Sequence, residues 1–165
     1  MSQEARFDRV TRFAIVPAAY LLLMRGEGPD LEVLLQQRGP DLSFRPGHWA
    51  TAAAGHVEQG ESVFAAAARE ALEELGVVVD PADITPLCAM QRTLPGVRDP
   101  VEQRVDFFLT ARTWSGEPEV REPHKCSAIG WFRPSALPEP MVPHERKLLG
   151  LLATGEVPPV VTFGF

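Results

Sequence analysis

The apolar positions along the chain follow two spacings, every second residue in some segments and every third or fourth residue in others. The first spacing, in runs rich in large and β-branched residues, predicts strands at residues 13–24, 31–37, 49–53, 77–79, 84–91, 103–112 and 129–132. Gly26, Gly28, Pro29 and Asp30 separate the first two runs, which indicates a β-hairpin. The breaker-rich segment 93–100 predicts a mobile loop.

The helical spacing occurs twice. The first predicted helix begins at Glu61 or Ser62 and runs to Leu75, after a glycine-rich loop at residues 55–60, and Gly76 is its expected stop. Its buried face should consist of Phe64, Ala67, Ala68, Ala71, Leu72 and Leu75. The second predicted helix covers residues 144–152, with Leu148, Leu149 and Leu152 inward. Strands enclosing two helices indicate an α/β fold, and the lack of repeats or linkers predicts one domain over residues 1–165.

The composition and net charge of the chain argue against several classes of binding partner. The chain has 165 residues, of which 45% are apolar, enough for one proper core. A net charge of −6 argues against general affinity for nucleic acid or an anionic membrane. The apolar run 13–24 is interrupted by Pro17 and is too short to span a bilayer, and no signal pattern precedes it, so a cytoplasmic location is expected. Cys88 and Cys126 have no metal-ligand spacing and are expected to be idle thiols.

Three acidic residues on the first predicted helix indicate a candidate site for a divalent cation. Glu70, Glu73 and Glu74 stand at i, i+3 and i+4, so they share one helical face, expected on the side opposite the apolar face. Like charges at that spacing destabilise a helix by about 0.2–0.5 kcal/mol per pair unless a cation offsets them. Mg²⁺ or Mn²⁺ suits such carboxylate oxygens. The alternative is a solvated acidic face.

Residues 55–77, GHVEQGESVFAAAAREALEELGV, resemble the Nudix box of the Nudix hydrolases, G-x5-E-x7-R-E-U-x-E-E-x-G-U, where U is a bulky apolar residue. The matching positions are Gly55, Glu61, Arg69, Glu70, Glu73, Glu74, Gly76 and Val77. Ala71 departs from the larger aliphatic residue of the pattern, and Ala54 stands where many members carry a second glycine.

The resemblance implies an α/β/α sandwich around a mixed central sheet and a MutT-like enzyme. Such an enzyme hydrolyses a pyrophosphate bond in a nucleoside diphosphate linked to another group, by attack of water, and releases a nucleoside monophosphate. A nucleoside triphosphate is the default substrate, and the family also implies a possible homodimer. The alternatives are a regulatory domain that binds a nucleotide or nucleotide sugar without hydrolysis, and a structural domain with an acidic face.

The resemblance also assigns roles to residues. Glu73, Glu74 and the backbone carbonyl of Ala54 are implied metal ligands, and Glu70 is either a third ligand or the base that activates water. Arg69 is implied to orient a box glutamate. Glu61 is expected to stabilise the loop or the helix start, as a cap or by pairing with Arg69.

Outside the box the indications are weaker. Arg38, at the end of a predicted strand, is the first candidate for phosphate contact, with Gly55 and His56 beside it in the loop. Arg45 and Arg104 are further candidates for phosphate, and Phe44, Trp49 and Phe108 for stacking on a base. Many family members carry another acidic residue shortly before a Trp-Phe pair. Here Cys126 and Ser127 occupy that place, which leaves Glu119, Glu122 or His124 as candidates.

Overall fold

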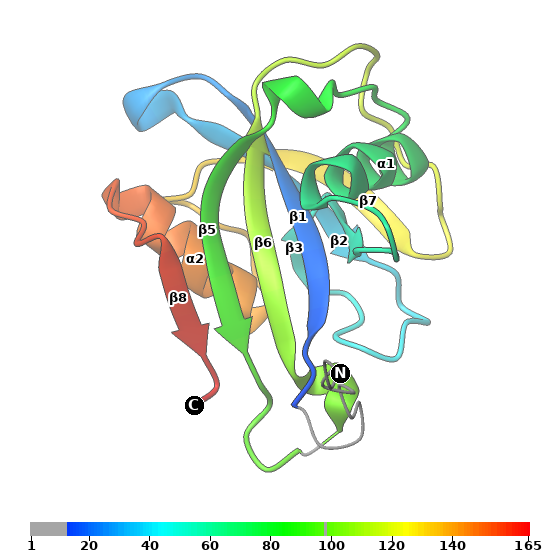
Figure 1. Ribbon diagram of the computed structural model, residues 1–165. Coiled ribbons are helices and arrows are strands. Elements are labelled where there is room, and N and C mark those ends of the chain that lie inside the picture. The colour runs from blue at the N-terminus through cyan, green and yellow to red at the C-terminus, as the bar shows by residue number, and fades with distance from the viewer. Residues whose placement is uncertain (1–12, 98) are drawn as a thin grey trace, which may run out of the picture.

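Eight strands and two α-helices make up the described part of the chain, residues 13–97 and 99–165 of the computed structural model (Figure 1). The strands are β1 (Val16–Arg25), β2 (Glu32–Arg38), β3 (Trp49–Thr51), β4 (Ala53–His56), β5 (Thr85–Arg92), β6 (Arg104–Ala111), β7 (Cys126–Phe132) and β8 (Val160–Phe163). The helices are α1 (Val63–Leu75) and α2 (Pro143–Thr154), and short 3-10 turns lie at Gly28–Asp30, Pro81–Asp83 and Pro100–Glu102.

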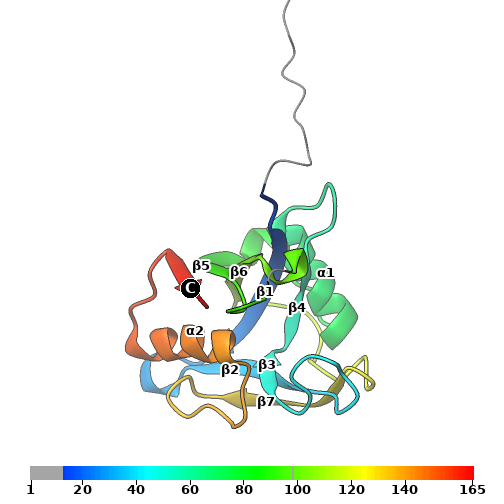
Figure 2. The same cartoon turned by 90° about the horizontal axis from the view of Figure 1, so that it is seen from below.

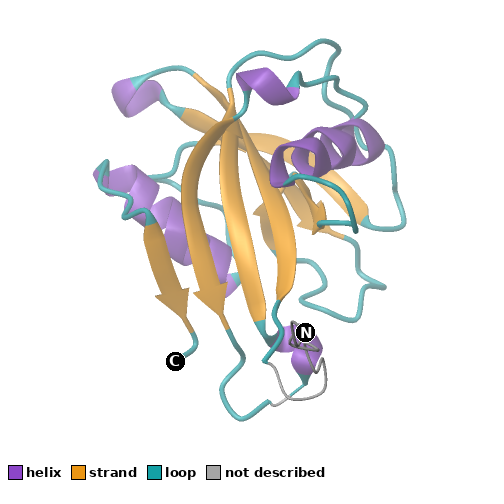
Figure 3. Ribbon diagram, in the orientation of Figure 1, coloured by secondary structure: helices purple, strands orange, loops and turns teal. Residues whose placement is uncertain are grey.

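The strands form one mixed sheet (Figure 3). Its order is β3-β2-β1-β6-β5-β8, with β4 also pairing with β1 and β7 with β2. The β1–β6 and β5–β8 pairs are parallel and the other strand pairs are antiparallel. The predicted hairpin is present, but β2 pairs with β1 only at Met24–Val33 and Arg25–Glu32, and beyond that point β1 pairs with β4 instead.

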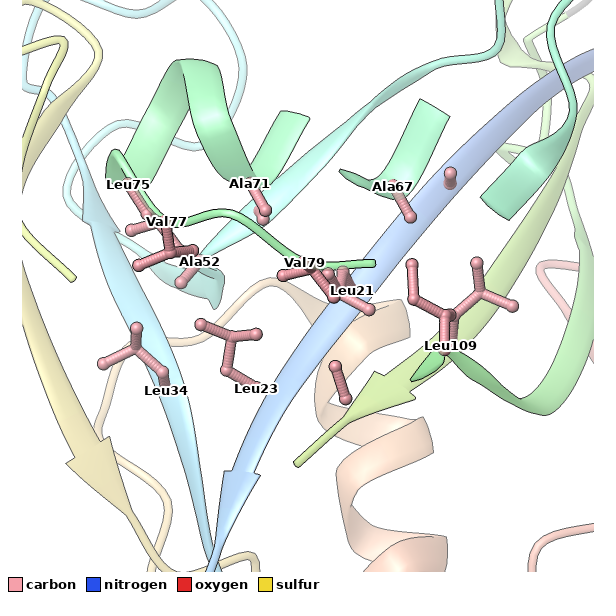
Figure 4. Close-up of a cluster of buried hydrophobic side chains, with 14 of the residues drawn as sticks. Leu21, Leu23, Leu34, Ala52, Ala67, Ala71, Leu75, Val77, Val79 and Leu109 are labelled. Carbon is pink, nitrogen blue, oxygen red and sulfur yellow. The ribbon is translucent and has the colours of Figure 1, made fainter. Parts of the chain in front are cut away.

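Two apolar clusters lie on opposite faces of β1, and each is covered by one helix (Figure 2). Because successive side chains of a strand point to opposite faces, Leu21 and Leu23 pack on the side of α1 (Figure 4), whereas Leu22 and Met24 pack on the side of α2 with Leu148. The predicted α/β/α sandwich with a mixed sheet is therefore confirmed. Among the described residues, neither helix is long and apolar enough to cross a membrane.

The ends of α1 agree with the sequence, but its buried face does not. Ser62 is the N-cap, and its hydroxyl accepts a hydrogen bond from the Ala65 N–H. Gly76 ends the helix with φ 70°, as expected for a C-terminal glycine. Leu72, predicted to be buried, is 51% exposed, whereas Ala66 is fully buried.

The buried face of α1 is thus rotated from the predicted one and passes close to two of the glutamates. Its buried residues are Ala66, Ala67, Ala71 and Leu75. Glu70 and Glu74 lie at the edge of this face, against the sheet, and not on the opposite side of the helix as predicted.

Three predicted strands have different bounds. The predicted strand 49–53 is divided between two short strands, β3 and β4, and β4 continues to His56. Gly55 and His56 therefore lie in β4 and not in a loop. Residues 77–79 form a single bridge, between Val78 and Ser115, in place of a strand. β7 begins at Cys126, three residues before the predicted start. The predicted mobile loop 93–100 includes residue 98, which lies outside the described residues.

Gly76→Val should lower the free energy of unfolding by about 1 kcal/mol or more, because a β-branched residue is strained at φ 70°. An added Cβ also meets the Arg121 side chain at 2.4 Å, but that exposed side chain can move away. The control is Gly150→Ala in α2, where no atom lies within 4 Å of the new Cβ. This change should stabilise the protein by about 0.5–1 kcal/mol. Urea denaturation measures both, and an unchanged stability of Gly76→Val contradicts the strain.

Candidate active site

Close packing of α1 on β4 fixes the position of two carboxylates. A Cβ atom added to Gly55 would lie 2.0 Å from the Glu70 Oε1 atom, so glycine is needed here for space. One residue earlier, the Ala54 N–H donates a hydrogen bond of 2.8 Å to Glu74 Oε2. The Glu70 side chain is only 13% exposed. The strand therefore holds both carboxylates in place, through the backbone N–H at position 54 and through the close approach that requires glycine at position 55.

Arg69 connects the helix to the residues that precede it. Its guanidinium binds both carboxylate oxygens of Glu61, with Nε–Oε1 2.8 Å and Nη2–Oε2 3.0 Å. It also donates to Glu70 Oε1 at 2.7 Å, to Glu73 Oε2 at 3.4 Å and to the His56 carbonyl at 3.1 Å. The structure thus brings together Arg69, Glu61 and Glu70, as the sequence led us to expect. Glu61 is not the N-cap, and it instead accepts from the N–H of Glu58.

The three carboxylates have different electrostatic surroundings. The hydrogen bonds from Arg69 lower the pKa of Glu61. Burial raises the pKa of Glu70, and Arg69 opposes the shift. Burial raises the pKa of Glu74 to about 8, against the hydrogen bond from Ala54. No described lysine or arginine forms an ion pair with Glu74. The site therefore carries buried negative charge that its own cations only partly balance.

The carboxylates do not form a ready-made metal cage. Within residues 13–97 and 99–165, no three histidine, cysteine, aspartate or glutamate side chains converge on one point. The reason is that Arg69 holds Glu70 and Glu73, while the backbone of β4 holds Glu74. Glu73 itself is 54% exposed. A cation that binds these glutamates must compete with Arg69 for two of them.

One of the three open candidates outside the box lies near the glutamates. The charge of Glu122 contributes to the raised pKa of Glu74, and Glu122 pairs with Lys125 at 2.9 Å. Glu119 instead pairs with Arg121 at 3.3 Å on the surface, and His124 is exposed.

A cavity of about 280 Å³ opens beside Glu74. One wall is formed by β4, and it includes the predicted substrate-binding residues Gly55 and His56. The third such residue, Arg38, also lines the cavity, and its Nε donates to the Phe44 carbonyl at 2.8 Å. The structure therefore places all three predicted residues on one cavity, next to the glutamates.

The rest of the cavity wall contains arginine and aromatic groups. Arg104 lies in contact with the His56 ring, and burial together with Arg104 lowers the pKa of His56. Phe44 lines the cavity, with the guanidinium of Arg38 5.4 Å from its ring centroid. Of the other aromatic candidates, Phe108 is fully buried in the core.

Sequence reasoning missed the polar floor of this cavity, which includes Tyr20, Arg92, His144 and Glu145. Behind the floor, the fully buried Asp106 pairs with Arg92. Burial lowers the pKa of His144 to about 2, so its ring is neutral, and Tyr20 Oη lies 3.5 Å from its Nε2.

Among these polar residues, only Asp106 could have been recognised from the sequence. Asp106 interrupts the otherwise apolar run 105–109, and a charged residue there needs a partner if both faces of the strand are covered. His144 and Glu145 could not be recognised from the sequence as buried cavity residues, because acidic and polar residues are common at helix starts.

Known proteins share both the box and the fold. A family model described as the NUDIX domain matches residues 14–152. A MutT NUDIX hydrolase from Burkholderia pseudomallei is 29% identical, with a TM-score of 0.64 over 81% of this chain and 96% of that chain. The NUDIX domain of Shewanella oneidensis NrtR, solved in complex with ADP ribose, has a TM-score of 0.68 over 94% of this chain and 99% of that chain. Its identity of 19% shows a shared fold alone.

A curated relative matches over a short stretch. Isopentenyl-diphosphate Delta-isomerase from Streptomyces coelicolor is 49% identical over 45 residues, which is 27% of this chain and 23% of that protein. The chain thus matches less than a quarter of that relative's length. The family model, in contrast, covers most of the chain and includes the whole of segment 55–77. This chain belongs to the NUDIX family and is a MutT-like Nudix hydrolase.

Proposed function

We propose that this enzyme hydrolyses a pyrophosphate bond in a nucleoside triphosphate or a related nucleoside diphosphate derivative, with Mg²⁺ or Mn²⁺, and releases a nucleoside monophosphate. The observation that carries the proposal is the fixed position of the Glu70 and Glu74 carboxylates on β4, beside a cavity lined by arginines. A nucleotide is a suitable ligand because this cavity joins groups for phosphate and groups for an aromatic base.

The donor set fits a hard divalent cation. Glu70, Glu73 and Glu74, with the carbonyl of Ala54, would hold it, since Mg²⁺ and Mn²⁺ prefer carboxylate and carbonyl oxygens. Glu74 is buried without a cationic partner among the described residues, which is the surrounding that a bound cation stabilises. When bound, such an ion polarises a phosphoryl oxygen and lowers the pKa of water.

The chain's own residues complete the site. Arg69 donates a hydrogen bond to the Glu70 carboxylate, which supports the proposal that Glu70 either binds the cation or accepts a proton from the attacking water. Arg38 uses its Nε on the Phe44 carbonyl, and its two terminal nitrogens make no hydrogen bond with a described residue. A guanidinium in this state can bind two phosphate oxygens at once. Arg104 is positioned to add a second positive charge at the same cavity.

A substrate panel tests this function directly. Phosphate release is measured with Mg²⁺ or Mn²⁺ on nucleoside triphosphates, with pyrophosphatase as coupling enzyme. ADP-ribose, sugar nucleotides and dinucleoside polyphosphates are assayed in the same way with phosphatase, which releases phosphate from their products. We expect one class to stand above the rest, and Glu73→Gln or Glu74→Gln to lower its turnover by about 100-fold or more. Glu119→Gln, an exposed carboxylate outside the cluster, is the control and should keep full activity. Near-wild-type turnover in both box variants would refute the ligand assignment, and binding without turnover would favour a regulatory domain.

Gly55→Ala should displace the Glu70 carboxylate, because the new methyl group would lie 2.0 Å from Oε1. We expect turnover to fall at least about 10-fold while the protein stays folded, since only one side chain must move. Ala54→Gly, one residue earlier, retains the backbone groups that contact Glu74 and serves as the control. Equal activity of Gly55→Ala and wild type contradicts the need for this close approach.

The stability of the metal-free protein should fall as pH rises from about 4.5 to about 8. The pKa of Glu74 is raised from 4.5 to about 8 in the folded protein, so over this range the native state keeps a proton that the unfolded state loses. Glu74→Gln removes this titration and should reduce the slope of melting temperature against pH in EDTA. Glu73→Gln, about half exposed, should keep the wild-type slope. Identical slopes in wild type and Glu74→Gln would show that Glu74 does not retain the proton.

A further inference from the structure

A second cavity, of about 560 Å³, lies beyond the end of β6. Arg104, which lines the cavity of the candidate active site, begins β6, whereas Thr113 and Trp114, which line the second cavity, follow its end. The eight residues of this strand, at about 3.3 Å each, extend over roughly 26 Å. The backbones of Val78 and Ser115 join the two walls of the second cavity by a pair of 2.9 Å hydrogen bonds. The proposed hydrolysis does not use this cavity.

The second cavity combines an aromatic and aliphatic wall with two carboxylates. Its lining includes the Trp114 indole, the apolar side chains of Val78 and Pro81, and the acidic residues Asp80 and Asp83. Val78 is 58% exposed, although it is a large apolar residue. Among the described residues, no lysine, arginine or histidine lines this cavity. The lining thus offers apolar surface and negative charge without positive charge.

The chain's own cations do not neutralise these two carboxylates. Asp80 Oδ1 accepts a hydrogen bond of 2.9 Å from the Ala82 N–H and so caps the 3-10 turn Pro81–Asp83. The ion pairs of the described residues include neither Asp80 nor Asp83. The whole chain carries a net charge of −6, which adds to the attraction of a cation. The second cavity is therefore an electrostatically favourable place for a positive ligand.

A pair of stacked indoles gives independent evidence for the kind of ligand. Trp114 stacks on Trp131, with ring centroids 6.0 Å apart and planes at 19°. The guanidinium carbon of Arg25 lies 4.2 Å from the centroid of Trp131. The face of an indole is electrostatically negative and attracts such cations. The pair thus already binds one guanidinium of the chain through Trp131, whereas Trp114 is the member that lines the second cavity.

We propose that the second cavity binds an organic cation, a guanidinium or alkylammonium group on an apolar body. Trp114 contacts the cationic group, and Asp80 and Asp83 balance its charge. Val78 and Pro81 contact the apolar body. A guanidinium suits this site because it can bind carboxylate oxygens and stack on an aromatic face at the same time. The cation belongs either to a free small molecule or to an arginine side chain of a protein partner, and the inference does not depend on the proposed function.

Titration with butylguanidinium, followed by NMR of the indole N–H groups, tests the site. The chain has three tryptophans, and Trp49, which packs on Phe132 and does not line the second cavity, is the internal control. We expect the Trp114 signal, assigned with Trp114→Leu, to shift until it saturates while the Trp49 signal stays in place. Butylurea has a similar shape but no charge, and it should bind at least about 10-fold more weakly.

Two variants test the contributions of the aromatic wall and the carboxylates. Trp114→Leu should weaken the binding of butylguanidinium at least about 5-fold, measured by calorimetry. Asp83→Asn should weaken it about 3-fold, because one carboxylate is lost from an exposed site. Asp83 lies on an exposed turn, so this variant decides the question if Trp114→Leu does not fold. Glu156→Gln removes the same charge from an exposed residue after α2 and should keep the wild-type affinity.

A capped Gly-Arg-Gly peptide and its citrulline counterpart distinguish the two sources of the cation. Tighter binding of the arginine peptide than of butylguanidinium supports the site with a protein partner, whereas weaker binding supports it with a free small molecule. A Trp114 signal that neither cation shifts overturns the proposal. Equal binding of butylurea and butylguanidinium, or wild-type affinity in Asp83→Asn, would equally contradict it.

Discussion

The contact between α1 and β4 is the constraint on which the rest of the site depends. Alanines at positions 66, 67 and 71 let the helix lie close to the sheet, and Gly55 leaves room for the Glu70 carboxylate directly on the strand. Charged side chains on an ordinary amphipathic helix extend into water and move freely. Here the helix is so close that Glu70 and Glu74 lie against the backbone, and their positions are set by the fold.

This placement has an electrostatic cost that Arg69 only partly offsets. Arg69 binds Glu61 with two hydrogen bonds and Glu70 with one, whereas Glu74 receives only a backbone N–H. A carboxyl group in this state either keeps a proton or requires an external cation. In the proposed function, a bound divalent ion would offset this imbalance.

The structural features that were predicted correctly from the sequence are those that depend only on residues close together in the chain. Ser62 and Gly76 determine the helix ends through local hydrogen bonds and φ. Gly76 was predicted as the end, and Ser62 was one of the two start residues, with Glu61, that the sequence left open. The buried face was wrong because hydrophobicity assigns Leu72 to the core and the glutamates to water, whereas the closeness of β4 buries Glu70 beside Gly55. The cavity floor could not be predicted, because its residues come from β1, β5 and α2 and share no sequence spacing.

The segment that joins β3 to β4 connects the two halves of the cavity. The Thr51 N–H holds Glu145 from α2, and the Ala54 N–H holds Glu74 from α1, so each helix contributes one buried carboxyl to the same short strand segment. Three residues of extended chain span at most about 10 Å. This short segment therefore limits how far apart the two carboxyl groups can lie. A change in the packing of either helix would therefore move a buried carboxyl group at this segment and alter the cavity on both of its sides, because the backbone between Thr51 and Ala54 contacts both helices.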